Sequence, residues 1–236
     1  MFCYEAIVSQ LPATLYAFSD RQACVQALSA ALVARLQAAL QVRPRARLVL
    51  PGGSGPQLLL PQLAATALDW SRVDLSPTDE RWVAAEDLAS NWRLLRDGLP
   101  VAHCLDPRQG ATPVLAVQHW GALLQDWLPL DAVLLGMGED GHCASLFAGM
   151  PGLMAALDPG AAPAALSALA PDEPRVRLSL NLAMLARTGW LGVLVFGARK
   201  REMLDALLRD APHTRQWPIH QLIYRAGQPV QVYWAP

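Results

Sequence analysis

The sequence predicts an α/β fold in which one doubly wound, largely parallel sheet is flanked by helices. Short apolar runs of strand length alternate with longer segments in helical spacing, which is the pattern of successive strand–helix–strand units. The chain has 236 residues, 53% of them apolar and 17% charged, enough for one large buried core. We therefore expect residues 1–236 to form a single domain.

The N-terminal part begins with a strand, a helix and a second strand. Residues 3–8 are expected to form a short strand. Ser19 and Asp20 then cap a long helix, rich in Ala and Leu, which ends before Pro44. The apolar run at residues 45–51 predicts a buried strand.

The next segments continue the alternation. Residues 56–68 favour a helix, although Pro61 fits it only in the first turn or at a local kink, which leaves the start of the helix open. Residues 71–82 are expected to be a strand that runs into a loop. Helices are then predicted near residues 90–92 and from Thr112 to Trp127.

The C-terminal part begins with residues 131–138, a nearly continuous apolar run that ends in glycine, as central parallel strands do. Residues 150–174, rich in Ala, Pro and Gly, are expected to form an irregular excursion with one or two helical turns. Further strands are predicted at residues 175–181, 190–197, 219–225 and 230–234, the last two as extra C-terminal strands, with a helix at 198–210.

Composition excludes several classes of protein. The formal charge is −1 without a Lys/Arg-rich run, so a nucleic-acid partner is not expected. The four cysteines are scattered, which argues against a zinc site or a disulfide framework and for reduced thiols in the cytoplasm. The apolar helix at residues 22–42 is amphipathic and carries Arg35, so we expect no membrane span. A monomer and a small homo-oligomer both stay open.

Four predicted loops stand where a ligand should bind. In doubly wound sheets ligands lie outside the carboxyl ends of the strands. Each of these loops follows a predicted strand, so we expect all four at one edge of the sheet. They are residues 51–56, 76–82, 136–145 and 197–200.

The first loop is nearly bare of side chains. Because it leads into a helix, Gly52 and Gly53 would let backbone N–H groups approach an anion, and Ser54 adds a hydroxyl. The loop matches neither common dinucleotide-binding nor P-loop spacing. A plain tight turn would explain the same residues.

The second and fourth loops carry cations. A guanidinium such as that of Arg81 can bind phosphate through two hydrogen bonds, whereas a solvated loop would explain the same residues. Lys200 lies in the first turn of a predicted helix, where the helix dipole disfavours a cation, which hints at an anionic partner. A solvated lysine is the alternative.

The third loop has glycines on both sides of Glu139 and Asp140, followed at once by His142. Histidine is the side chain best suited to proton transfer near neutral pH, so His142 is a candidate general base oriented by a neighbouring carboxylate. Alternatively, Asp140 is a turn residue and His142 starts a helix. On a helix Cys143 would point away from His142, which excludes a Cys–His dyad. No metal-ligand spacing is present. The other histidines (His103, His119, His213 and His220) are assigned structural or surface roles.

Taken together, the four loops resemble those of the 6-phosphogluconolactonase family, most specifically in the segment GMGEDGHCASLF at residues 136–147. The resemblance covers nearly the whole chain. It implies a fold shared with glucosamine-6-phosphate deaminases and related to ribose-5-phosphate isomerase and CoA transferases. The implied reaction is hydrolysis of 6-phosphoglucono-1,5-lactone to 6-phosphogluconate, in the oxidative pentose phosphate pathway, without metal or organic cofactor.

The resemblance also implies roles for individual residues. It makes His142 the general base that activates water, supported by Asp140, although Glu139 stays open as the supporting carboxylate. Arg175, at the start of a strand, is expected to face the site. The residues implied to bind the substrate phosphate are Gly52, Gly53, Ser54, Arg81 and Lys200.

Three residues depart from the family pattern. Pro51 replaces a small residue, while Gly55 and Arg177 each stand where threonine is usual. An aminosugar-phosphate isomerase/deaminase is disfavoured, because no Asn-Glu pair follows the Asp-Gly-His segment. A non-catalytic sugar-phosphate sensor is disfavoured because no basic DNA-binding helix is apparent.

Overall fold

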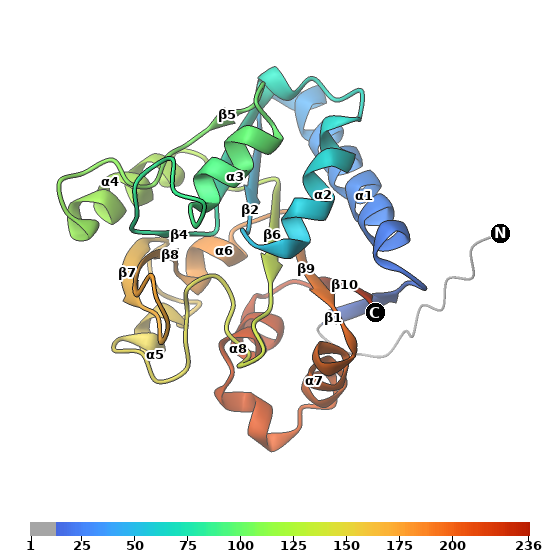
Figure 1. Cartoon of the computed structure of the whole chain (residues 1–236), viewed down its shortest axis with the longest axis vertical. Coiled ribbons are helices and arrows are strands. Elements are labelled where there is room, and N and C mark those ends of the chain that lie inside the picture. Colours follow the sequence, from blue (N-terminus) through green and yellow to red (C-terminus); the bar gives the residue numbers. More distant parts are fainter. Residues whose placement is uncertain (1–12) are drawn as a thin grey trace.

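The computed structural model describes residues 13–236 and contains two sheets (Figure 1). The larger sheet has seven strands in the order β1-β10-β9-β6-β2-β3-β5, and every pairing in it is parallel. Its strands are β1 (Ala13–Ala17), β2 (Ala46–Leu50), β3 (Val73–Pro77), β5 (His103–Cys104), β6 (Ala132–Gly136), β9 (Leu191–Phe196) and β10 (Val230–Ala235). The largely parallel sheet predicted from the sequence is confirmed.

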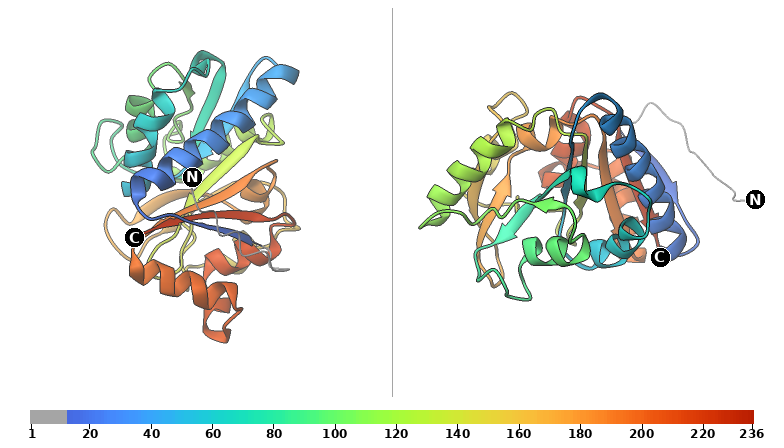
Figure 2. Two further views of the ribbon diagram at one scale, coloured as in Figure 1. Left: turned by 90° about the vertical axis from the view of Figure 1, so that its right-hand side faces the viewer. Right: turned by 90° about the horizontal axis from the view of Figure 1, so that it is seen from above.

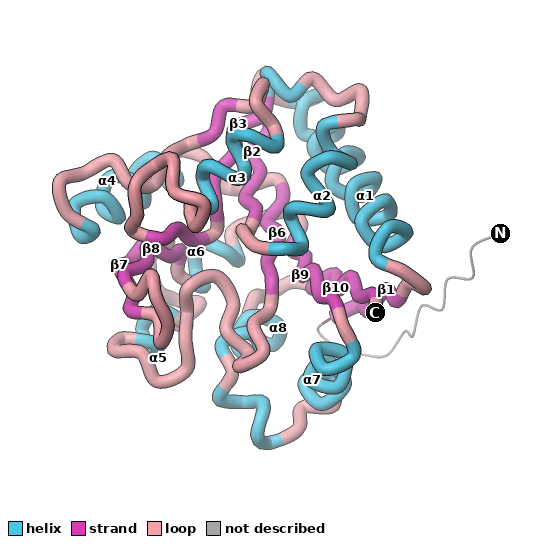
Figure 3. The backbone as a smooth tube through the Cα atoms, viewed as in Figure 1, coloured by secondary structure: helices cyan, strands magenta, loops and turns pink. Residues whose placement is uncertain are grey.

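The smaller sheet is antiparallel. Its order is β4-β8-β7, formed by β4 (Asp79–Arg81), β8 (Val176–Leu180) and β7 (Ala165–Leu169). The helices are α1 (Arg21–Val42), α2 (Ser54–Ala64), α3 (Asn91–Gly98), α4 (Pro113–Gln125), α5 (Leu153–Ala156), α6 (Leu182–Ala186), α7 (Ala198–Leu208) and α8 (Pro218–Arg225). Figure 3 separates these elements from the long loops that join them, including the one that leaves β6.

Both faces of the large sheet are buried. Strand β2 shows this directly, because Leu48 and Leu50 belong to one apolar cluster and Val49, between them, belongs to the other. Successive side chains of a strand point to opposite faces, so the two clusters lie on opposite sides of the sheet. Helix α1 packs on the Leu48 side, and Figure 2 shows it crossing that face of the strands.

Local capping signals placed several helices correctly. The Asp20 carboxylate accepts a hydrogen bond from the N–H of Ala23 at the start of α1, as the sequence predicted. Ser90 and Thr112 cap α3 and α4 in the same way. Helix α2 begins two residues earlier than expected, and Pro61 lies in its interior rather than in its first turn.

Helix α1 is long and apolar enough, by length and composition alone, to cross a membrane. A helix in a protein core passes the same test. Seven residues of α1 are buried, and the helix packs against α2, β2 and β10. These contacts account for its apolar composition.

Some predicted elements are wrong or were missed. Residues 219–225 form helix α8 rather than a strand, because Pro218 starts a helix and the apolar residues Ile219, Leu222 and Ile223 are buried together at helical spacing. Strands β1, β5 and β7 and helix α6 were not predicted. The expected strand at residues 3–8 lies outside the described residues.

The segment after β3 is a second strand and not a loop. Asp79–Arg81 forms β4, which leaves the large sheet and pairs with β8. Residues 150–174 do contain one helical turn, α5, and they also contain β7. Strand β7 is rich in Ala and Leu without β-branched residues, so its strand state depends on pairing with β8.

Candidate active site

The four predicted loops open into one pocket of about 1160 Å³. Three of them follow β2, β6 and β9, at the carboxyl ends of neighbouring strands of the large sheet, and β4 supplies the fourth. Every residue that the sequence assigned to the site lines this pocket. These residues are Gly52, Gly53, Ser54, Arg81, Asp140, His142, Arg175 and Lys200.

The turn before α2 has glycines for reasons of packing and backbone conformation, and it leads to a helix end without a side-chain cap. A Cβ atom on Gly52 would lie 1.8 Å from Oδ1 of Asn91, so a side chain there would displace this buried amide, which donates to the carbonyl of Asp79. Gly53 has a φ of +92°, which also favours glycine. No side chain caps α2, and its first N–H groups therefore stand free to meet an anion at the pocket.

Strand β4 is fixed by the buried carboxylate of Glu80. This carboxylate accepts hydrogen bonds from the backbone N–H groups of Arg81, Asn91 and Trp92 and from the hydroxyl of Ser90. Burial raises the pKa of Glu80, and the three backbone donors oppose that rise. Because side chains alternate along a strand, locking Glu80 on one face turns its two neighbours to the other face, toward the pocket.

One nitrogen of the Arg81 side chain has a hydrogen-bond partner and a second, buried nitrogen has none among the described residues. Its Nη1 donates to the carbonyl of Ala89 at 2.7 Å. Its Nε is buried and has no hydrogen-bond partner among the described residues. A buried donor without a partner is costly, so an acceptor oxygen in the pocket would be bound favourably here.

The loop after β6 brings a carboxylate onto the histidine. Oδ1 of Asp140 lies 2.5 Å from Nδ1 of His142 and also accepts the backbone N–H of His142 at 3.1 Å. The loop closes through hydrogen bonds from the N–H of Gly138 to the carbonyl of His142 and from the N–H of Gly141 to the carbonyl of Gly138. The hydrogen bond from His142 lowers the pKa of Asp140 to about 2, so this group is a carboxylate at neutral pH.

The two acidic residues of this loop face different partners. The Glu139 carboxylate is exposed and lies 3.5 Å from Nε of Arg199. Of the two candidates, it is therefore Asp140 that contacts His142. The Nε2 atom of His142 has no partner among the described residues, and its ring lies beside Phe147, 4.7 Å between centroids.

Cys143 is not available as a nucleophile. Its side chain is buried, and burial raises the pKa of the thiol to about 12. The segment around it is a series of turns, so the alternative that His142 starts a helix is wrong. The dyad is excluded by this burial rather than by helical geometry.

Sequence reasoning missed the residues that tie this loop to the small sheet. The hydroxyl of Ser145 donates to Oδ2 of Asp79 at 2.6 Å, and its backbone N–H donates to the hydroxyl of Ser179 at 3.1 Å. Asp79 and Ser179 stand opposite each other in β4 and β8. A serine three residues after His142 was visible in the sequence, but its partner 66 residues away was not.

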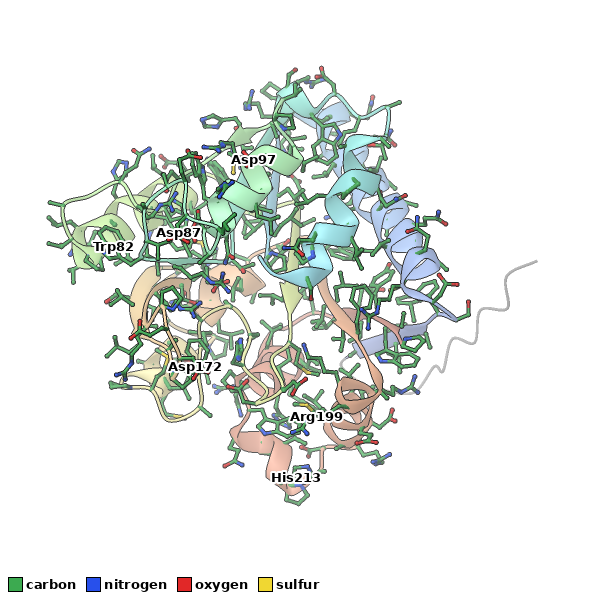
Figure 4. All side chains as sticks on the ribbon, viewed as in Figure 1. Trp82, Asp87, Asp97, Asp172, Arg199 and His213 are labelled. Atoms are coloured by element: carbon green, nitrogen blue, oxygen red, sulfur yellow. The ribbon has the colours of Figure 1, made fainter. Side chains whose placement is uncertain are left out.

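The pocket is rich in cations. Lys200 lies in the first turn of α7, and Arg21 and Arg177 line the pocket although the sequence did not assign them to the site. Two of the acidic residues that line the pocket have other partners, in the pairs Asp140–His142 and Glu139–Arg199. Figure 4 labels Asp172, which lines the pocket, and Arg199, on opposite sides of the loop after β6 in that view.

Within residues 13–236 there is no group of three or more His, Cys, Asp or Glu side chains that could hold a metal ion. The chemistry that the described side chains can support is proton transfer at His142, next to a site for an anion. That combination suits the attack of water on an anionic ester or lactone.

Comparisons with known proteins agree with this geometry. The family model described as glucosamine-6-phosphate isomerases/6-phosphogluconolactonase matches residues 19–234. The 6-phosphogluconolactonase of Rhizobium meliloti (strain 1021) is 33% identical over 96% of this chain and 100% of the relative. That of Pseudomonas aeruginosa is 36% identical over 89% of each chain.

Solved structures show the same similarity. The crystal structure of a 6-phosphogluconolactonase from Shewanella baltica OS155 superposes with a TM-score of 0.86 at 28% identity, covering 98% of this chain and 100% of the other. A putative 6-phosphogluconolactonase from Neisseria gonorrhoeae FA 1090 gives a TM-score of 0.83 at 26% identity, covering 94% and 99%.

Proposed function

Because this chain belongs to the family of glucosamine-6-phosphate isomerases and 6-phosphogluconolactonases, we propose that it hydrolyses 6-phospho-D-glucono-1,5-lactone to 6-phospho-D-gluconate in the pentose phosphate pathway. The relatives that match nearly the whole chain at 33–36% identity are named for this activity. The observation that carries the proposal is the Asp140–His142 pair, which lies in a cation-rich pocket at the carboxyl ends of the strands.

In this proposal His142 is the general base. Its Nδ1–H donates to Asp140, so the lone pair for accepting a proton is on Nε2. The base takes a proton from a water molecule as its oxygen attacks the lactone carbonyl carbon. The carboxylate of Asp140 then stabilises the imidazolium that forms. General-base catalysis of this kind contributes roughly 10²- to 10⁴-fold in rate.

The substrate phosphate is assigned to the other part of the pocket. The open N-terminus of α2 supplies backbone N–H groups at Gly53 and Ser54, and Arg81 supplies a buried donor without a partner. Lys200 and Arg175 add positive charge from two further elements. Together these groups would neutralise a dianion and hold the lactone carbon near His142.

No covalent intermediate is proposed. The thiol of Cys143 is buried, the hydroxyl of Ser145 is bonded to Asp79, and the hydroxyl of Ser54 is assigned to the phosphate. Water is the nucleophile in this proposal. Mass spectrometry of protein quenched during turnover should show no acyl adduct, and an adduct would contradict this mechanism.

The activity is tested by measuring 6-phosphogluconate release from freshly made lactone, after subtraction of the spontaneous rate. Wild type should release it rapidly, and His142→Ala should lower kcat roughly 10²- to 10⁴-fold. The matched control is His119→Ala, an exposed histidine of α4, which should behave as wild type. Equal rates for wild type and His142→Ala would refute the assignment of the base.

The substrate class has its own test. Unphosphorylated glucono-1,5-lactone should be a much poorer substrate, since it lacks the group that the cations bind. Glucosamine 6-phosphate, the substrate of the other branch of the family, should give no ammonia. We also propose that residues 1–236 act as one cytoplasmic domain on this small molecule, without nucleic acid or membrane, as a monomer or small homo-oligomer.

A further inference from the structure

Two arginines stand directly opposite each other where β4 pairs with β8. Arg81 and Arg177 are register partners in this antiparallel pair, and both line the pocket. The neighbouring pair on the same face is Asp79 and Ser179, which holds Ser145 of the loop that carries His142. The arginine pair therefore lies next to the Asp79–Ser179 pair along the two strands, and that pair holds the loop of His142.

The two arginine charges repel each other. Like charges directly opposite in an antiparallel pair destabilise a sheet. The Arg177 side chain is nevertheless only 9% exposed, and burial together with the charge of Arg81 lowers its pKa. No carboxylate within the described residues is at ion-pair distance from either guanidinium. Asp79, Glu80 and Asp172 oppose the lowering of the pKa of Arg177 only from beyond that distance, and Asp79 is itself bonded to Ser145 and Thr78.

Both guanidinium groups have donors to spare. Nε of Arg177 donates to the carbonyl of Pro174 at 2.6 Å, and its Nη atoms have no hydrogen-bond partner within residues 13–236. Nη1 of Arg81 is bonded to Ala89, whereas its Nε is buried without a partner. A charged pair with unused donors on the wall of a pocket is suited to an anion that accepts from both.

The turn before α2 cannot supply the same donors. Ser54 is its one hydroxyl, and a side chain at Gly55 would begin 3.1 Å from Cδ2 of Leu194, closer than ordinary van der Waals contact. Arg177, from the small sheet, adds donors to the same pocket that this turn does not provide.

We propose that Arg177 is a specificity-determining residue, which binds the phosphate of the substrate together with Arg81 and selects a dianion over a monoanion. A dianion compensates both guanidinium charges, whereas a monoanion leaves one uncompensated in a largely buried place. The identity of the substrate as a phosphate ester rests on the proposed function. The selection of a dianion rests on the arginine pair itself.

The test is direct binding, which needs no turnover. Glucose 6-phosphate and glucose 6-sulfate share a sugar but carry a dianion and a monoanion at neutral pH, and calorimetry gives both affinities. Wild type should prefer the phosphate. Arg177→Thr should weaken phosphate binding roughly 10- to 100-fold, as expected for a charged hydrogen bond, and should reduce the preference over sulfate. Arg177→Lys keeps the charge but not the planar guanidinium, so its phosphate affinity should lie between those of wild type and Arg177→Thr.

The matched control is Arg187→Thr, which removes an exposed arginine outside the pocket and should leave both affinities unchanged. Thermal unfolding separates binding from packing. Without ligand, Arg177→Thr and Arg177→Met should melt at or above the wild-type temperature, because a like-charge contact is gone. When glucose 6-phosphate is added, the melting temperature of both variants should rise less than that of wild type. A lower melting temperature with unchanged phosphate affinity would show a merely structural role and overturn the proposal.

Kinetics distinguishes this proposal from the proposed function. Arg177→Thr should raise KM for the phosphorylated lactone about as much as it weakens binding, with a smaller change in kcat. If the wild-type protein prefers the dianion but does not hydrolyse the lactone, the proposed function is refuted and the role of Arg177 is supported. If the enzyme is active but Arg177→Thr keeps the wild-type KM and phosphate affinity, only the proposed role of Arg177 is refuted.

Discussion

At the scale of single residues, the carboxylate of Asp140 decides which nitrogen of His142 can accept a proton. The 2.5 Å contact of a carboxylate with Nδ1 favours the proton there, which in the proposed mechanism leaves Nε2 as the base. Glu139, one position earlier, contacts Arg199 instead. Two adjacent carboxylates in one loop therefore have different partners, and the sequence alone could not separate them.

A pair of isosteric substitutions tests this difference. Asp140→Asn should lower kcat about 10²- to 10⁴-fold, because an amide cannot stabilise the imidazolium and can favour the wrong tautomer. Glu139→Gln should keep kcat within about twofold, since an exposed ion pair contributes little. The measurement is steady-state kinetics on the phosphorylated lactone, and equal losses in both variants would contradict the assignment.

The pH dependence of kcat follows from the same contact. The hydrogen bond from His142 lowers the pKa of Asp140 to about 2, so its carboxylate is protonated only as the pH falls toward that value. Asp140 should therefore stay ionised between about pH 4 and neutrality and add no step of its own to the pH profile of kcat in that range. An acidic step in this range that is lost in Asp140→Asn would show that Asp140 titrates there and would contradict the expectation.

At the scale of elements, the three-residue strand β4 serves both the fold and the site. Glu80 faces α3 and accepts the N–H groups at its start, while Asp79 and Arg81 face the pocket. A change at Glu80 therefore reaches the site through the position of the strand, although Glu80 itself does not line the pocket.

We expect Glu80→Gln to lower the free energy of unfolding by about 2–4 kcal/mol. The NH2 group of the new amide would face backbone N–H groups that now donate hydrogen bonds to the carboxylate. Glu86→Gln removes an exposed carboxylate paired with Arg96 and should change stability little. Urea denaturation of both variants measures the difference. Equal midpoints would show that the buried hydrogen bonds of Glu80 contribute nothing.

The elements that the sequence predicted best are those that local patterns specify. Strands β6 and β9 are continuous apolar runs, β2 is an apolar run interrupted only by Arg47, and α1 has a capping residue at its start. The strand state of β7 and β4 depends instead on pairing with β8, which follows β7 closely but lies far from β4 in the sequence. The error at residues 219–225 arose because Ile and Tyr favour strands locally, whereas packing of one apolar stripe made a helix.

The site, too, was predicted where local patterns specify it and missed where distant contacts do. Its four loops were predicted because the carboxyl ends of parallel strands meet at one edge. The roles of Ser145, Asp79 and Arg177 were not predicted, because they arise from contacts across the antiparallel sheet. No periodicity in the sequence specifies which residues stand opposite each other in two strands nearly 100 positions apart.

At the scale of the whole molecule, the two apolar clusters share the strands that separate them. Strand β2 contributes Leu48 and Leu50 to one cluster and Val49 to the other. Loss of either cluster would therefore expose a face of the same sheet, which supports the proposal of a single domain.

Unfolding should accordingly occur in one transition. Far-UV circular dichroism, which follows all helices, and tryptophan fluorescence, which follows both clusters through Trp70 and Trp120, should give superimposable urea curves. A plateau between two separate transitions would indicate two domains and contradict the proposal.

The position of β10 sets the order in which this sheet can be completed. Strand β1, near the N-terminus, reaches the large sheet only through β10, which lies between it and β9. During synthesis the ribosome must therefore release residues 230–235 before β1 can find its partner. Until then β9 is an open strand edge, the kind of surface that chaperones protect from aggregation. The nascent chain thus carries two unpaired strands, β1 and the edge of β9, for as long as β10 is missing.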